Sequence, residues 1–491
     1  MFVLLNIKLH HHPILGDVVL DFVNADNNTD KGLVSVIIGR NGIGKSYLLS
    51  AIVHIFKTIE LLVEEKDKKL PTLKFQFSVT YLLDGHTYQV SNLYDKNMYG
   101  YSYNSFQYLK DNVFCDNTQI QFPQAIIASS MTIADKYPTP SIGRYKYRGV
   151  RSENTPSVTG TRTFVRKAVD GILDSLTNKY TTRQDLAIIL RELGFMERME
   201  LEYGFRYRNV FLREDMAPSL LNDIFTNWQN YFKGRTSEVW GSKYYATLKK
   251  NTDKIEKVCT FLRQSTEWLR KHNRHNLVYD IFDSDNTLLQ DYEAIKLLTN
   301  LDIITFPKFK VFKDRDGYDF VNSSSGETQQ LCQFISVMSA IQSNSLILID
   351  EPENSSHPNW QISYIDWLRK IFRDYDDCHF IIATHSHFIL SDLQPQWASI
   401  IALDRENDKV VNKARDVNTF CWSADDILYR VFHVRNTRNY VFESRMVELL
   451  GYIQNRQMNL PRAQIVLKEL KSYILNQNDP LNKLIAEAEK C

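Results

Sequence analysis

The chain has 491 residues, which is enough for two or three domains, and its formal net charge of +1 excludes a chain-wide field that would attract polyanions. Its six cysteines lie far apart without paired spacing, which argues against a zinc site or a disulfide framework and predicts a reducing, cytoplasmic location. The amino terminus lacks a cationic leader, and no apolar run approaches the roughly 18 residues of a membrane helix, so we expect no membrane contact.

A phosphate-binding loop is predicted near the amino terminus. Residues 1–56 read as three strands (FVLLNIKL, DVVLDFV and LVSVII) followed by an amphipathic helix over residues 46–56. The turn before this helix fits G-x-x-x-x-G-K-[ST], in which backbone N–H groups and the helix N-terminus cradle phosphates. Lys45 would reach the β- and γ-phosphates, and Ser46 would bind Mg²⁺. The predicted loop for a nucleoside triphosphate is Gly39, Arg40, Asn41, Gly42, Ile43, Gly44, Lys45 and Ser46.

The remaining pattern along the chain predicts four regions. Residues 73–130 contain further strand-like runs, residues 150–300 carry apolar residues at helical spacing, and strands return at 303–312 and 317–322. From about residue 429 the chain reads as small helices punctuated by Pro461 and Pro480. We predict an amino-terminal ATPase lobe (1–150), a helical insert or arm (151–300), a carboxy-terminal ATPase lobe (301–428) and a helical region (429–491).

An acidic pair follows the most apolar strand of the second lobe. Residues 346–349 form a continuous apolar run, which is typical of a central parallel strand buried on both faces. Asp350 and Glu351 come directly after it, at the strand end where ligands bind in open α/β sheets. We predict that Asp350 holds Mg²⁺ opposite Ser46, and that Glu351 acts on the attacking water as general base.

Two further segments complete a resemblance to the ABC-type ATPase head. NSSSGETQQLCQ precedes the acid strand, and CHFIIATHSHFIL follows it as a buried strand ending near His385. The order resembles the signature turn, acid strand and switch histidine of that family, and implies an α/β P-loop ATPase head split by a helical insert. The resemblance places Ser324, Ser325, Gly326 and Glu327 at the γ-phosphate and makes His385 its sensor. Ser323, Ser325 and Glu327 depart from the usual leucine, glycine and glutamine, although the glutamate is common in RecF-like and defence-associated members.

The resemblance also implies assembly. In such heads the signature serine caps the nucleotide held by another copy, so ATP joins two subunits. A homo-oligomer of at least two copies, and of higher order in this branch, is therefore expected, with the loop at 354–357 near the seam.

A narrower resemblance concerns the biological role. DEPENSSHP resembles a motif of ABC-like ATPases of anti-phage systems and of overcoming-lysogenization-defect nucleases. The stretches at 124–152 and 419–440 resemble the ATPase subunit of the Septu defence system, including its retron-associated versions. This implies a small HNH nuclease as a separate partner, with a reverse transcriptase and its RNA/DNA, or DNA itself, as further candidates.

An intrinsic nuclease centre is not expected. FDSDN (Asp283, Asp285) fits a short metal pattern but lies before the signature, and we interpret it as a solvated turn. RKHNRHN (His272, His275) lacks further ligands, and we interpret it as a polar helix end.

A basic segment at 144–167 has two readings. It holds seven cations against one acid, Glu153, with Tyr145 and Tyr147 interleaved. This composition fits either a nucleic-acid contact or an alternating strand with a solvated cationic face.

We therefore predict an oligomeric ATPase that uses ATP and Mg²⁺ to regulate a separately encoded nuclease in anti-phage defence. Two alternatives are a DNA-repair ATPase of the RecF or SMC kind that clamps DNA, and an ATP-binding scaffold that sequesters a toxin. A long heptad arm or a compact DNA-binding lobe would favour the first, and absence of turnover would favour the second.

Overall fold

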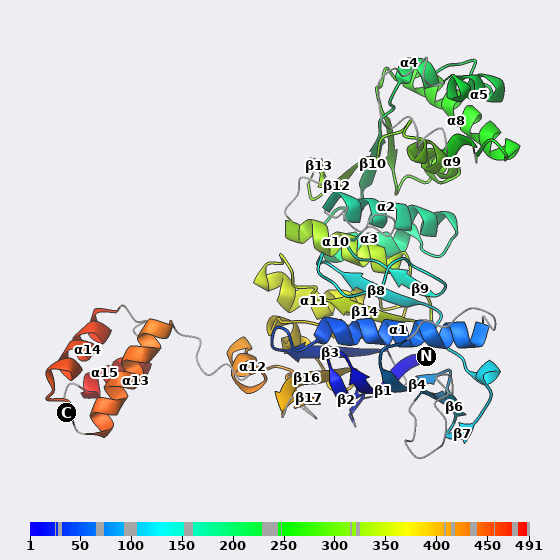
Figure 1. Ribbon diagram of the computed structural model, residues 1–491. Helices are drawn as coiled ribbons and strands as arrows, with labels where there is room; N and C mark the ends of the chain where they lie inside the picture. Colours follow the sequence, from blue (N-terminus) through cyan, green and yellow to red (C-terminus); the bar gives the residue numbers. More distant parts are fainter. Residues whose placement is uncertain are drawn as a thin grey trace. The chain divides into compact units, whose positions relative to one another are not determined.

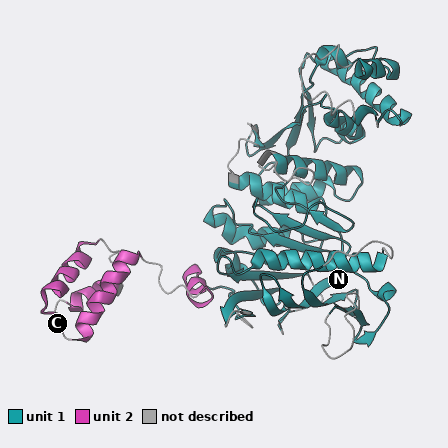
Figure 2. Ribbon diagram, in the orientation of Figure 1, with its two compact units in different colours: residues 1–422 teal, residues 423–491 magenta. Residues whose placement is uncertain are grey.

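The computed structural model divides into two compact units, Met1–Trp422 and Ser423–Cys491 (Figure 2). It describes residues 1–24, 26–27, 32–64, 73–92, 106–151, 161–227, 244–246, 248–314, 317–320, 325–406, 409–413, 418–432, 439–455, 457–473 and 480–488.

A seven-stranded sheet forms the centre of the first unit (Figure 1). Its order is β17-β16-β3-β15-β14-β8-β9, and every neighbouring pair is parallel except β16 with β17. The strands come from both predicted lobes, so the two halves of the chain build one sheet. They are β3 (Leu33–Gly39), β8 (Ile126–Ser130), β9 (Tyr145–Tyr147), β14 (Leu346–Asp350), β15 (His379–Ala383), β16 (Ala398–Glu406) and β17 (Lys409–Asn412).

Helices cover both faces of this sheet, which explains why its strands are apolar without alternation. All five residues of β15 are buried. Ile381 joins the core formed with α1 (Lys45–Glu64), whereas its neighbour Phe380 contacts Phe372, just beyond α11 (Pro358–Ile371), with ring centroids 5.4 Å apart. The predicted buried strands are therefore confirmed.

A second, antiparallel sheet shares the core around α1. Its order is β2-β1-β4-β5-β6-β7. The buried His379 ties the two sheets together, because its Nδ1 accepts from Leu4 N at 3.0 Å and its Nε2 lies 2.9 Å from Ser35 Oγ. Burial lowers the pKa of His379 to about 3, so the ring is neutral. The strands are β1 (Phe2–His12), β2 (Gly16–Asp21), β4 (Gln76–Leu83), β5 (His86–Ser91), β6 (Gln107–Lys110) and β7 (Val113–Phe114), with the short helix η1 (Asn117–Gln119) after them.

Helix α1 is the longest apolar helix of the first unit. Among the described residues it is the one helix long and apolar enough to cross a membrane, and 61% of its most apolar window is buried inside the protein. Its apolar residues pack in the core between the two sheets. Core packing therefore accounts for its composition, which the sequence analysis had not flagged.

The insert is not wholly helical, which corrects the sequence prediction. Helices α2 (Thr161–Thr177) and α3 (Arg183–Glu192) contact α10 (Ser325–Met338) and α11. Beyond them β10 (Met199–Tyr203) and β11 (Leu277–Asp280) form a four-stranded antiparallel sheet, in the order β11-β10-β12-β13, with β12 (Lys308–Phe312) and β13 (Gly317–Asp319). The two strands of the insert, β10 with five residues and β11 with four, are too short for a clear period-2 signal between long helices. The remaining helices are α4 (Arg208–Phe211), α5 (Pro218–Thr226), α8 (Thr252–Lys271) and α9 (Leu288–Asn300).

The second unit is helical. Helix α13 (Tyr440–Gln454), α14 (Pro461–Ser472) and α15 (Pro480–Ala488) share a small apolar core around Leu449 and Leu470. α14 and α15 each begin at a proline, because a first-turn position needs no N–H donor. Helix α12 (Ala424–Arg430) precedes them, and the short helix η3 (Phe388–Asp392) belongs to the first unit.

Candidate nucleotide site

The carboxyl ends of three adjacent parallel strands bring the predicted catalytic segments together. Ala383 of β15 pairs with Ile37 of β3 on one side and with Asp350 of β14 on the other. The phosphate-binding loop therefore starts at the same sheet edge at which the acidic pair and the histidine segment begin. Residues more than 300 positions apart meet there.

The glycine loop has the shape that the motif predicts. Gly42 and Gly44 have φ values of 78° and 110°, a backbone region that favours glycine. A Cβ atom added to Gly44 would lie 2.4 Å from Leu15 Cδ2, so a side chain there would have to displace Leu15 as well as adopt a strained φ. Arg40 and Asn41 are exposed at the rim of the loop, and Ile43 is buried beneath it. The loop passes into α1 at Lys45.

Lys45 lies at the centre of the site and is only 4% exposed. Its Nζ donates to Gly39 O at 2.9 Å and lies 2.7 Å from His385 Nε2. Burial lowers the pKa of Lys45 to about 8, against the opposing attraction of Glu351, Glu353 and Asp350. The direct hydrogen-bond partners of the Lys45 Nζ are the neutral Gly39 carbonyl and the His385 ring, so a bound phosphate would be a stronger partner for it.

The Ser46 hydroxyl and the Asp350 carboxylate lie next to each other at the carboxyl ends of the strands. Ser46 Oγ donates to Asp350 Oδ1 at 3.1 Å, and Asp350 is 1% exposed. Burial raises the pKa of Asp350 to about 7, although the Ser46 hydrogen bond lowers it. A hydroxyl and a carboxylate at this spacing are the oxygen donors that Mg²⁺ prefers.

Glu351 is turned away from the direction of its strand. Its φ of 51° is uncommon for a residue other than glycine, and such backbone outliers gather at functional sites. Its carboxylate accepts from Asn354 Nδ2 at 3.2 Å and lies 3.5 Å from His385 Nε2. The acid is thus aimed at the Lys45 region rather than along β14.

His385 lies between Lys45 and Glu351. Burial and the nearby Lys45 ammonium lower the pKa of His385, so the neutral ring accepts the lysine's hydrogen bond. The His385 backbone N donates to Glu353 Oε1 at 2.5 Å. Glu353 and Asn354 were not among the predicted site residues. Their place within DEPEN, immediately after Glu351, is the sequence signal that could have identified them.

The signature segment is described only from its second half. Ser324 lies outside the described residues, and the side chain of Ser325, the first residue of α10, is not described. A Cβ atom added to Gly326 would lie 2.6 Å from Ser355 O, so the helix start packs directly on the loop after Glu351. Glu327 forms an ion pair with Lys313 at the end of β12.

The residues present fit ATP with Mg²⁺. The loop has glycines at the positive-φ positions of the phosphate-binding motif and leads into the N-terminus of α1, Lys45 is a buried cation, and Ser46 with Asp350 supplies oxygen donors. When bound, Mg²⁺ would neutralise phosphate charge and orient the leaving group.

The basic segment is largely occupied by contacts within the chain. Tyr145 and Tyr147 are fully buried, so neither can stack on a base. Arg151 Nη2 donates to Asp135 Oδ1 at 2.5 Å, and Arg144 Nη2 donates to Glu64 Oε1 at 3.2 Å. Residues 152–160, with Glu153, and the side chain of Arg162 lie outside the described residues. The described part therefore favours the structural reading over the nucleic-acid reading.

The weaker nuclease patterns lie where the sequence analysis placed them. Asp283 and Asp285 occupy the turn between β11 and α9, where Asp283 Oδ1 accepts from Asp285 N at 2.9 Å. His272 caps the end of α8 and stacks on Trp268 with ring centroids 4.4 Å apart. Within the described residues, no group of three or more His, Cys, Asp or Glu side chains could hold a metal ion.

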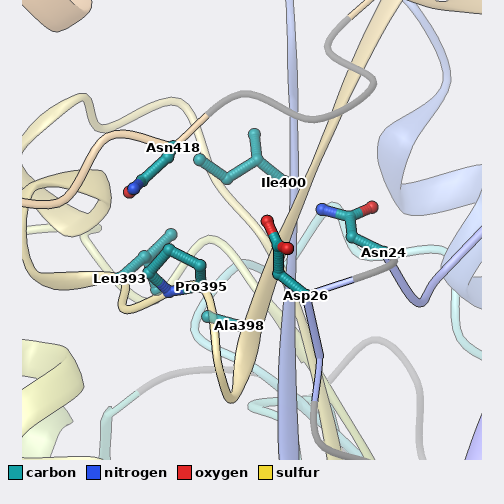
Figure 3. Close-up of a pocket in the computed structure, with 7 residues that line it drawn as sticks. All are labelled: Asn24, Asp26, Leu393, Pro395, Ala398, Ile400 and Asn418. Carbon is teal, nitrogen blue, oxygen red and sulfur yellow. The ribbon is translucent and has the colours of Figure 1, made fainter.

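A pocket lies at the amino-terminal ends of β3 and β16 (Figure 3). Ala398, at the start of β16, pairs with Val34, whereas the phosphate loop begins beyond Gly39 at the far end of β3. This pocket is therefore separate from the nucleotide site. Its lining residues are Asn24, Asp26, Leu393, Pro395, Ala398, Ile400 and Asn418.

A protein-family comparison identifies the fold. The model of the AAA ATPase domain matches residues 16–390, which is most of the chain. The chain belongs to the AAA ATPase domain family. The predicted α/β P-loop ATPase fold is therefore confirmed, and the family supports ATP binding and ATPase activity.

Solved structures with similar arrangements include three SMC heads. The SMC head domain from Thermotoga maritima is 10% identical, with 84% of this chain and 99% of that chain covered and a TM-score of 0.35. An Smc head bound to the C-terminal winged-helix domain of ScpA is 11% identical, with coverage of 84% and 98% and a TM-score of 0.32. The Smc head from Pyrococcus furiosus bound to the ScpA C-terminal domain is 14% identical, with coverage of 89% and 100% and a TM-score of 0.31. No curated protein matches the chain.

Proposed function

We propose that the chain hydrolyses ATP at the site built by β3, β14 and β15. Lys45 compensates the charge of the β- and γ-phosphates, and Ser46 with Asp350 holds Mg²⁺. Glu351 takes the proton of the attacking water, and His385 senses the γ-phosphate. The observation that carries the proposal is the contact of Lys45 with His385 at 2.7 Å, beside the Ser46–Asp350 pair and Glu351.

The site is proposed to be completed by a second copy. A γ-phosphate ligand is expected from the signature turn at 323–327, which the family resemblance assigns to the neighbouring subunit. Within one chain Gly326 packs against Ser355, so the start of α10 lies beside the loop that the resemblance places at the seam. ATP would then stabilise a homo-oligomer of two or more copies, because it would lie between the phosphate-binding loop of one copy and the signature turn of another.

The proposed role is control of a separately encoded nuclease in anti-phage defence. Its support is the sequence resemblance of DEPENSSHP and of the stretches at 124–152 and 419–440 to the Septu ATPase subunit, including retron-associated forms. The expected partner is a small HNH nuclease. A reverse transcriptase with its RNA/DNA is a further candidate, and the expected compartment is the cytoplasm.

Purification with and without the neighbouring gene product tests this role. Alone, the chain should hydrolyse ATP but leave plasmid DNA uncut with Mg²⁺ or Mn²⁺. Co-expressed with its neighbour, it should co-purify in a complex whose cutting depends on the neighbour's catalytic residues. Metal-dependent cutting by the isolated chain would contradict this division of labour.

A DNA-clamping ATPase is the second candidate. The observation that favours it is the make-up of the arm, whose described residues combine helices of 4 to 20 residues with the β11-β10-β12-β13 sheet. ATP-dependent, salt-resistant retention of circular DNA by the chain alone would support this candidate over nuclease control.

A further inference from the structure

One side chain joins the loop after the acid strand β14 (residues 351–357) to the loop after β15 that carries His385 (residues 384–387), here called the switch loop. Gln361, in the first turns of α11, donates from Nε2 to Ser356 O at 2.9 Å. Its Oε1 accepts from Ser386 Oγ at 2.6 Å. The Gln361 amide therefore uses both its NH₂ group and its oxygen to link the loop after Glu351 to the residue next to His385.

This bridge continues to the signature helix. Gln330 of α10 is 2% exposed and donates from Nε2 to Ser356 Oγ at 2.8 Å. Gly326 at the start of the same helix packs on Ser355. Ser356 therefore accepts one glutamine hydrogen bond from each of two helices, and these two bonds fix its position.

The switch loop depends on Ser386 for its shape. Ser386 is 6% exposed, its N donates to Thr384 Oγ1 at 2.9 Å, and its Oγ accepts from Phe388 N at 3.2 Å. The backbone N and the hydroxyl of Ser386 together hold the segment from Thr384 to Phe388, which contains His385. Displacing Ser386 would move the His385 ring relative to Lys45 and Glu351.

We infer that Gln361 is a positioning residue that sets the distance between Glu351 and His385 by clamping their two loops. The inference rests on the proposed ATPase site. Gln361 touches neither the phosphate loop nor the Mg²⁺ donors in the described contacts, so it acts on turnover and not on ATP binding.

The first test separates binding from turnover. Gln361→Met keeps the length of the side chain and removes both hydrogen bonds. Its kcat should fall by roughly 2- to 30-fold, as expected for loss of one element of a coupling network, while the Kd for a fluorescent ATP analogue stays unchanged. Gln290→Met makes the same substitution on the exposed side of α9 and should change neither quantity. Wild-type kcat in Gln361→Met would overturn the inference.

A double-mutant cycle keeps the test independent of general destabilisation. Ser386→Ala removes the other partner of the 2.6 Å hydrogen bond. If the bond carries the effect, the kcat losses of Gln361→Met and Ser386→Ala should be clearly less than multiplicative in the double variant. Fully multiplicative losses would mean that the two residues act separately, which contradicts the clamp.

Oligomers mixed from two variants can test the role of Gln361 separately from the proposal that two copies share each ATP site. In a mixture of Ser324→Arg and Lys45→Ala chains, the active site uses Lys45, Glu351 and His385 of the Ser324→Arg chain. Gln361→Met should therefore reduce turnover when carried by the Ser324→Arg chain and not by the Lys45→Ala chain. Equal losses from either chain would overturn the clamp, whereas no turnover in the parent mixture would contradict the composite site alone.

Discussion

Lys45 and Glu351 carry different parts of the proposed chemistry, so their variants should fail differently. Lys45→Ala removes the buried cation that faces the phosphates, and ATP binding should be lost. Glu351→Gln keeps shape and most contacts but cannot accept a proton, so ATP should bind while turnover falls by ~10²–10⁴-fold. Nucleotide titration and phosphate release measure the two effects.

Glu293→Gln provides the matched control for the acid. Glu293 lies on α9 with its side chain 43% exposed and pairs with Lys257 at 2.7 Å, so the same change there should leave turnover intact. Wild-type turnover in Glu351→Gln would show that the general base is another group.

Lys45 and Asp350 also predict a pH window for Mg–ATP binding. Asp350, with its pKa raised to about 7, is protonated at lower pH and then loses its affinity for Mg²⁺. Lys45, with its pKa lowered to about 8, loses its charge at higher pH and attracts phosphate less. Affinity should therefore be highest between pH 7 and 8 and fall on both sides, as measured by titration calorimetry.

The two limbs can be assigned by varying Mg²⁺. Because Mg²⁺ competes with the proton for Asp350, raising its concentration should move the acid limb to lower pH and leave the alkaline limb in place. A binding affinity that stays flat from about pH 6 to about pH 9 would contradict both assignments.

At the scale of elements, the segment around β9 is expected to stabilise the fold. Arg151 pairs with Asp135 at 2.5 Å, where the Asp135 side chain is fully buried and also accepts from Tyr147 OH at 2.7 Å. Arg151→Met leaves that carboxylate without its cation and should lower the free energy of unfolding by ~3 kcal/mol. Chemical denaturation measures the change.

Arg166 offers a control from the same basic segment. Its pair with Asp170 is 3.5 Å long, with side chains 48% and 42% exposed, so Arg166→Met should cost less than ~0.5 kcal/mol. If Arg151→Met were as stable as wild type but lost DNA retention in a salt-sensitive way, the nucleic-acid reading of the segment would return.

Elements whose signal is contiguous in sequence could be predicted, and elements defined by distant partners could not. The run before Asp350 marks β14 because burial on both faces makes every residue apolar. By contrast, β10 is recognisable mainly through its pairing with β12, more than 100 residues later. Helix α1 continues to Glu64, beyond the predicted end at residue 56, because its apolar residues also pack on the second sheet.

The candidate site shows the same division. Lys45, Ser46 and Asp350 belong to sequence motifs that are recognisable from residue type and spacing. They come together because their strands are parallel neighbours in one sheet. The Gln361–Ser386 contact joins residues 25 positions apart through the packing of α11 on the switch loop. The sequence of an amphipathic helix does not indicate which distant side chain one of its glutamines will contact.

At the scale of the whole molecule, the central claim is that each ATP is held by one chain and completed by another. The site described above supplies the cradle, the Mg²⁺ donors, Glu351 and His385 from one chain. The signature at 323–327 is the remaining part, and we propose that a second copy supplies it.

Turnover by a mixture of two inactive variants tests that claim most directly. Lys45→Ala destroys the cradle, and Ser324→Arg places a bulky cation in the signature and leaves Lys45 intact. In a mixed dimer one site pairs an intact cradle with an intact signature, so phosphate release should reappear when the two verified, exchanging variants are combined. Absence of any turnover in that mixture, with subunit exchange demonstrated, would contradict the shared site.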